Sequence, residues 1–509
     1  MQNQTLKKTA IWLAALVAFL LLVLMIWATL QTAQFKTYNQ LQTVTGASLL
    51  SLAGLGLAGG LAYFLKNKNS LIIFIVIMLL TALKLIFMIR YPATLTSDFW
   101  TYDNLAKSVV GGTTWQQMLS AGTLGNNILW PHVLNIAWFF SVFDSFFIPS
   151  TITGQVVSII LSGISIFMLY MLLGKFLAKS VAIFAALLFH FIPAFWLYSI
   201  LNAPESFFLV FLLGSFIFYY DALYTVNKTH TRNYFYLGCS LLLLFLANAI
   251  RPIVLVWIVV VLFFSVFSVA SERISFRRLL TTTAIFALTF SLLTAVSVPL
   301  YRVIYGINFA PATVEQHYFF ATGTSVATSG AYNAKIRNET DRILGKKDMA
   351  LDTRYHQITD RMTAISTANL TAIQRTGPMN FLWKKTINLM SEDYGANWFL
   401  YNTAGKTSGA YFNQILPLGV ASSVVYFVLL LLLAAASVLW QLVLMLKKSA
   451  LTHMDINSLF YEVLLLDGFF LSSLIFEVQG RYHIVLYLPI VILIALGGQL
   501  IIRQFSRTR

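Results

Sequence analysis

Long apolar runs alternate with short polar segments along most of the chain. A helix needs about 18–20 apolar residues to cross a bilayer, and a membrane β-barrel would instead show short segments of alternating polarity. The pattern therefore predicts an all-α polytopic membrane protein with about twelve transmembrane helices, interfacial helices and one large hydrophilic loop. The expected spans are 9–30, 44–65, 71–90, 151–173, 180–199, 204–223, 233–250, 252–270, 279–303, 414–446, 457–476 and 482–502.

Residues 129–147 form a further apolar run, and the basic residues decide how it is assigned. Basic residues gather in cytoplasmic loops, so Lys7 and Lys8 place the N-terminus in the cytoplasm. If 129–147 crossed the membrane, the later basic clusters would all face outward. We therefore predict an interfacial or re-entrant helix there, anchored by Trp130 and Trp138, with both termini cytoplasmic. These clusters are Lys175/Lys179, Lys228/Arg232, Arg273/Arg277/Arg278, Lys447/Lys448 and Arg503/Arg507/Arg509.

Composition agrees with this topology. Only 10% of the residues are charged, against roughly 25% in soluble domains. The net charge of +16 is explained by the inner loops, so we expect membrane lipids and no nucleic acid as partners. The chain divides into two N-terminal helices (1–70), a core (71–303) containing a first outer loop (91–150), a large outer loop (304–413) and C-terminal helices (414–509).

Acidic residues are few, and two of them lie at the predicted outer ends of helices. Asp98 follows Ser97 at the start of one helix, and Glu205 follows Pro204 at the start of another. An acid in a first turn stabilises the helix dipole, which is one interpretation of both. The other is that Asp98 accepts a proton from a hydroxyl nucleophile. Together the two carboxylates would also suit Mg²⁺ or Mn²⁺.

Basic and aromatic residues occupy the same predicted membrane face. Arginine offers a planar fork that matches phosphate oxygens, although arginines at helix ends also reach toward lipid headgroups. We expect a phosphate-binding rim, supported by Tyr102, Asp103 and Glu477. The rim residues are Arg481, Tyr482, His483, Arg251 and His132.

Two other patterns in the sequence have structural interpretations. Asp467 lies inside an apolar run, where an acid marks either a functional pathway or a buried structural pair. "GLGLAG" at 54–59 matches a dinucleotide-binding pattern but lies in a predicted span without a preceding strand. The spacing of Gly56 and Gly60 fits close helix packing instead. The large outer loop is expected to be partly folded: 333–370 is rich in helix formers, and 376–390 is amphipathic and expected to lie along the membrane.

Five stretches in order resemble the GT-C class of membrane glycosyltransferases, and most closely its bacterial branch related to protein O-mannosyltransferases and the lipid A aminoarabinose transferase. They extend over most of the chain from about residue 71. The stretches are "SDFWTYDNLAKSVVGG", "WPHVLNIAWFF", "FIPAFWLYSILNAPESFFLV", "ANAIRPIVLV" and "EVQGRYHIVLYLPIVILIALGG".

The resemblance implies transfer of a sugar from a polyprenyl-phosphate carrier to a hydroxyl of an acceptor outside the bacterial cytoplasmic membrane. Asp98 matches the family's presumed base, and Glu205 its second acidic position, where many relatives have aspartate. Arg481 and Tyr482 match the region thought to hold the carrier phosphate. Direct displacement would invert the anomeric centre. Cell-envelope polymers, lipids and proteins stay open as acceptors, and a lipid-linked sugar flippase, another transporter or a non-catalytic envelope subunit stays open as the alternative.

Overall fold

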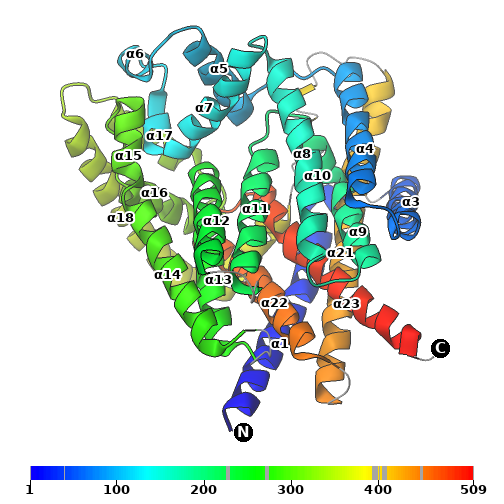
Figure 1. The fold of residues 1–509 in the computed structure, drawn as a ribbon. Coiled ribbons are helices and arrows are strands. Elements are labelled where there is room, and N and C mark those ends of the chain that lie inside the picture. Colours follow the sequence, from blue (N-terminus) through cyan, green and yellow to red (C-terminus); the bar gives the residue numbers. More distant parts are fainter. Residues whose placement is uncertain are drawn as a thin grey trace.

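The computed structural model describes residues 2–38, 40–224, 230–269, 274–391, 399, 402–403, 410–447 and 451–507, and these are almost entirely helical (Figure 1). Ten helices are long and apolar enough to cross a membrane. The all-α polytopic membrane fold is thus confirmed. The ten are α1 (Gln2–Leu30), α3 (Leu41–Leu65), α4 (Ser70–Arg90), α8 (Thr151–Leu173), α11 (Glu205–Tyr224), α12 (His230–Ile250), α14 (Phe276–Ala295), α21 (Ala410–Leu446), α22 (His453–Ile475) and α23 (Tyr487–Arg507).

Three of the twelve expected spans differ from the prediction. The run 180–199 is divided into α9 (Lys179–His190) and α10 (Pro193–Tyr198), because Pro193 cannot donate to the preceding turn and begins a new helix. The run 252–270 contains only α13 (Val254–Phe267). The run 279–303 also breaks, into α14 and α15 (Ser297–Tyr305). Both α9 and α13 remain apolar helices inside the bundle.

The segment 91–150 forms a cap of short helices at one end of the bundle, shown at the top of Figure 1. It contains α5 (Ser97–Val110), α6 (Trp115–Ser120), η1 (Gly125–Leu129) and α7 (Pro131–Phe146). α7 packs along α5 and is too short to count among the spans. We call this end of the bundle the loop end.

Trp130 and Trp138 differ in their surroundings. Trp138 is 48% exposed, as an interfacial residue should be, whereas Trp130 is buried. The Trp130 ring lies edge-on to Tyr318, and the Arg337 guanidinium stands 4.4 Å from its centroid. The prediction that Trp130 anchors the protein in the membrane is therefore wrong, because residues distant in sequence cover it.

The described part of the large loop is helical. It contains α16 (Ala312–Gly323), α17 (Ala334–Leu344), α18 (Leu351–Thr376) and α19 (Pro378–Met390). The helix formers at 333–370 thus lie in α17 and α18, and the amphipathic stretch at 376–390 forms α19. Tyr355, Ile358 and Met362 follow helical spacing on α18 and are buried. α18 packs against α16. The segments 392–398, 400–401 and 404–409 lie outside the described residues.

Backbone contacts join this loop to the segment after α22. The Glu477 amide donates to the Phe319 carbonyl at 3.1 Å, and the Val478 amide donates to the Gly330 carbonyl at 2.9 Å. A Cβ atom added to Gly323 would lie 2.4 Å from the carbonyl carbon of Phe476. Only glycine at position 323 allows the two backbones to approach this closely.

Replacing Gly323 by alanine is expected to destabilise the protein by about 1–3 kcal/mol, because the added methyl group forces two backbones apart. The measurement is the thermal unfolding midpoint in detergent. Gly60→Ala is the matched control, since a Cβ there meets no atom within 4 Å. The same holds at Gly56, so the close helix packing predicted for this pair is wrong. An unchanged midpoint for Gly323→Ala would contradict the assigned contact.

Candidate functional site

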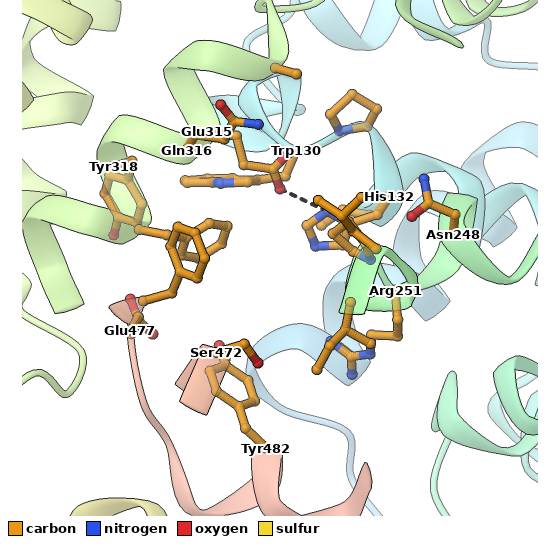
Figure 2. Close-up of a pocket in the computed structure, with 18 of the residues that line it drawn as sticks. Trp130, His132, Asn248, Arg251, Glu315, Gln316, Tyr318, Ser472, Glu477 and Tyr482 are labelled. Carbon is orange, nitrogen blue, oxygen red and sulfur yellow. Dashed lines mark ion pairs between the residues drawn. The ribbon is translucent and has the colours of Figure 1, made fainter. Parts of the chain in front are cut away.

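A cavity of about 2080 Å³ lies at the loop end, where helices from distant parts of the chain meet (Figure 2). Polar side chains from both predicted outer loops and from the segment after α22 point into it. The cavity is bounded by the start of α5, the η1–α7 segment, the α12–α13 connection, α14 and α15, α16 and α17, and residues 468–485.

Two arginine–carboxylate pairs line the cavity. The Arg481 guanidinium donates to Oδ2 of Asp98 at 2.6 Å, across 383 positions of sequence. The Arg251 guanidinium donates to Oε1 of Glu205. The structure therefore brings together the four charged residues that the sequence analysis placed at one membrane face.

Local sequence explains why these side chains emerge where they do. Asp98 belongs to the first turn of α5, directly after Ser97, whose φ of 53° is uncommon for a residue with a Cβ. Arg251 follows the last residue of α12, where Pro252 has no amide to continue the helix. Arg481 is the second residue of the short 3₁₀ helix η2 (Gly480–Leu486).

Electrostatics keep Asp98 ionised. Burial alone would raise the pKa of this carboxyl, but the charge of Arg481 and its hydrogen bond outweigh burial and lower the pKa. Arg251 and His132 act in the same direction. Tyr102, one turn along α5 and buried in the cavity wall, has a raised pKa because of burial and the charge of Asp98. Tyr102 therefore stays a neutral hydrogen-bonding group.

His132 and Glu315 face one another across the cavity (Figure 2). Nδ1 of His132 lies 3.3 Å from Oε1 of Glu315. His132 is the second residue of α7, and Glu315 belongs to the first turn of α16. The contact joins the two predicted outer loops. Sequence reasoning missed Glu315, because an acid in the first turn of an ordinary amphipathic helix carries no distinguishing signal.

Glu477 and Tyr482 also line the cavity. Oε1 of Glu477 accepts a hydrogen bond from Gln479 at 2.6 Å. Burial raises the pKa of Glu477, although Gln479 and Arg481 oppose the change. The Tyr482 ring lies 5.7 Å from the Arg481 guanidinium carbon. Both residues are thus placed where the sequence predicted, and their roles remain predictions.

His483 and Asp103 are not brought to the cavity. Nδ1 of His483 donates to the Leu389 carbonyl at 2.9 Å, and the ring stacks on Phe427. Asp103 accepts hydrogen bonds from Lys107, Thr151 and Asn202, which ties α5 to α8 and to the start of α11. The prediction that His483 binds phosphate and that Asp103 supports the site is therefore wrong in geometry, because both side chains are taken up in packing contacts.

The expected divalent cation does not fit the donor set. Asp98 and Glu205 each bind an arginine, whose positive charge would repel a cation placed between them. In the described part of the chain, no group of three or more histidine, cysteine, aspartate or glutamate residues lies close enough to hold a metal ion together. No chemical step at this site is therefore assigned to Mg²⁺ or Mn²⁺.

One wall of the cavity is apolar. It consists of side chains from α13, α14 and α22, including Leu255, Phe290 and Leu471. Leu255 and Leu471 are 59% and 50% exposed. The cavity therefore combines two arginine–carboxylate pairs with an accessible hydrocarbon wall.

Comparisons with known proteins give a limited likeness. No protein-family model and no curated protein sequence matches the chain. Among solved structures, it is similar to the oligosaccharyltransferase AglB from the archaeon Archaeoglobus fulgidus, both in a complex with an inhibitory peptide and a dolichol-phosphate and in the apo form. Each match has 12% sequence identity and a TM-score of 0.47.

Each match covers 87% of this chain and 52% of the archaeal one, so the chain spans about half the length of those proteins. Identity this low does not carry over the ligands of the archaeal enzyme. The function proposed for this chain therefore rests on the residues of its own cavity. The resemblance of five sequence stretches to the bacterial branch of the GT-C class stays a prediction.

Proposed function

We propose that the protein is a membrane glycosyltransferase that moves a sugar from a polyprenyl-phosphate donor to an acceptor hydroxyl. The observation that carries this proposal is the adjacency of two arginines and an apolar wall in one cavity. A polyprenyl phosphate is an anion joined to a long hydrocarbon chain. Guanidinium groups match its phosphate oxygens, and the side chains of α13, α14 and α22 match its hydrocarbon.

The proposed reaction is a direct displacement. The acceptor oxygen forms a bond to the anomeric carbon while the bond from that carbon to the phosphate oxygen breaks, and its electron pair leaves with the phosphate. Asp98 is proposed to take the hydroxyl proton. Arg481 and Arg251 stabilise the charge that grows on the leaving phosphate. Such a displacement inverts the anomeric configuration.

Sidedness follows from the charge distribution. The positive-inside rule places the loop end outside the cytoplasmic membrane, so we propose that the acceptor is an extracytoplasmic polymer, lipid or protein of the cell envelope. Helices α16 to α19 border the cavity or pack on the helices that do. Loops of this kind commonly determine specificity, and we assign acceptor recognition to them.

The test uses the purified full-length chain in nanodiscs with a series of polyprenyl-phosphate sugars. We expect a lipid-linked sugar to co-purify and be identified by mass spectrometry, and a new glycosidic bond of inverted configuration to be seen by NMR. Retained configuration would contradict direct displacement. Movement of the lipid-linked sugar across vesicles without a new glycosidic bond would instead favour a flippase.

A further inference from the structure

The Asp98–Arg481 pair presents a conflict for the proposed chemistry. Arg481 is needed for the donor phosphate, yet its guanidinium already binds a carboxylate. Asp98 is needed as a base, yet the same contact lowers its pKa and so weakens it as a proton acceptor. Both side chains line the cavity, where a phosphate would reach them.

We propose that the donor phosphate displaces Asp98 from Arg481, so that donor binding itself releases the catalytic base. This inference rests on the proposed function and adds an order of events to it. In the donor-free protein Asp98 is held as a weak base. Once phosphate oxygens occupy the guanidinium fork, Asp98 is available to the acceptor hydroxyl.

The two carboxylates differ in how deeply they are buried, and this difference indicates which of them a phosphate can displace from its arginine. The Asp98 side chain is 40% exposed, whereas that of Glu205 is 8% exposed. Asp98 can therefore turn toward solvent in the cavity at small cost, while Glu205 would remain buried without its partner, which is expensive. Arg481 is 14% exposed and is the second residue of η2, so its side chain has less room to move than that of Asp98.

The exchange changes the surroundings of Asp98 at one contact. After the exchange, Arg251 and His132 still act on Asp98, as do Tyr102 on its own helix and Glu477 in the segment after α22. Only the contact with Arg481 has been lost.

The first experiment measures binding of a short-chain polyprenyl phosphate by calorimetry. Asp98→Asn is expected to bind it about tenfold more tightly than the wild type, because the competing charged hydrogen bond is gone. Asp98→Ala should act in the same direction, which excludes a new contact from the asparagine amide. Asp467→Asn is the matched control with unchanged affinity, since Asp467 lies in α22 and does not line the cavity. Thermal unfolding midpoints check the fold of each variant.

The outcomes separate the two proposals. Unchanged or weaker binding by both Asp98 variants would overturn the exchange while leaving donor binding intact. If the wild type and the Asp98 variants alike fail to bind polyprenyl phosphate, the proposed function itself fails.

A second experiment uses the pH dependence of transfer. A base must be ionised, so the rate falls as pH falls through its pKa. The acidic limb of kcat/KM for the donor reports donor-free protein, in which Arg481 lowers the pKa of Asp98. The acidic limb of kcat reports the donor complex, in which that contact has been lost. We expect the kcat limb at higher pH; coincident limbs or the reverse order would overturn the exchange.

Discussion

Replacing Arg481 by alanine is expected to raise KM for the polyprenyl-phosphate donor about 100-fold, equivalent to about 2.7 kcal/mol. The side chain is mostly buried and lines the cavity together with that of Arg251. Its removal takes away a bidentate partner for the phosphate. KM for the acceptor should change less, because Arg481 is assigned to the donor phosphate and not to the acceptor.

Two controls sharpen this prediction. Arg481→Lys keeps the charge but loses the planar fork, so its KM for the donor should lie between those of the wild type and the alanine variant. Arg232→Ala removes an exposed arginine at the start of α12, outside the cavity, and it should leave both KM values unchanged. A larger change for the acceptor than for the donor in Arg481→Ala would remove Arg481 from the phosphate site.

The membrane fold could be predicted because bilayer thickness imposes a length on every apolar run. The same logic placed Asp98 and Arg481 at one end of the bundle, since alternating crossings and basic loops determine which segments share a side. Their direct contact at 2.6 Å could not be predicted in this way. Topology places two residues on one face, but only helix packing determines whether their side chains meet.

The sequence did not predict the directions in which neighbouring side chains point. Arg481, Tyr482 and His483 are consecutive, and the sequence analysis assigned all three to phosphate binding. In a 3₁₀ helix successive side chains project about 120° apart. Arg481 and Tyr482 therefore reach the cavity, whereas His483 turns into the bundle and contacts Leu389.

Contacts between the two predicted outer loops were also missed. Trp130 was predicted to be a membrane anchor, but Tyr318 and Arg337 lie against its ring. His132 appeared to be a phosphate ligand with no visible partner, and Glu315 is that partner. These pairs are separated by about 180 residues or more, and nothing in either local pattern points to the other.

Asp98→Asn is expected to lower kcat for sugar transfer by about 10²–10⁴, the usual contribution of a positioned general base. Asparagine preserves shape but does not accept the hydroxyl proton. With donor binding retained, the loss should appear in kcat and not as a raised KM for the donor. Transfer is measured with lipid-linked donor at saturating concentration, beside the thermal unfolding midpoint.

Asp467→Asn distinguishes the proposed enzyme from a transporter. Asp467 is a buried acid within α22, and its Oδ1 has no hydrogen-bond partner among the described residues. A pathway for protons or substrate through the bilayer would depend on such a group, whereas chemistry confined to the cavity at the loop end would not. We therefore expect Asp467→Asn to transfer sugar at close to the wild-type rate. Normal transfer by Asp98→Asn together with loss of transfer in Asp467→Asn would mean that the essential group lies in the helix bundle and not in the cavity. The glycosyltransferase assignment would then fail.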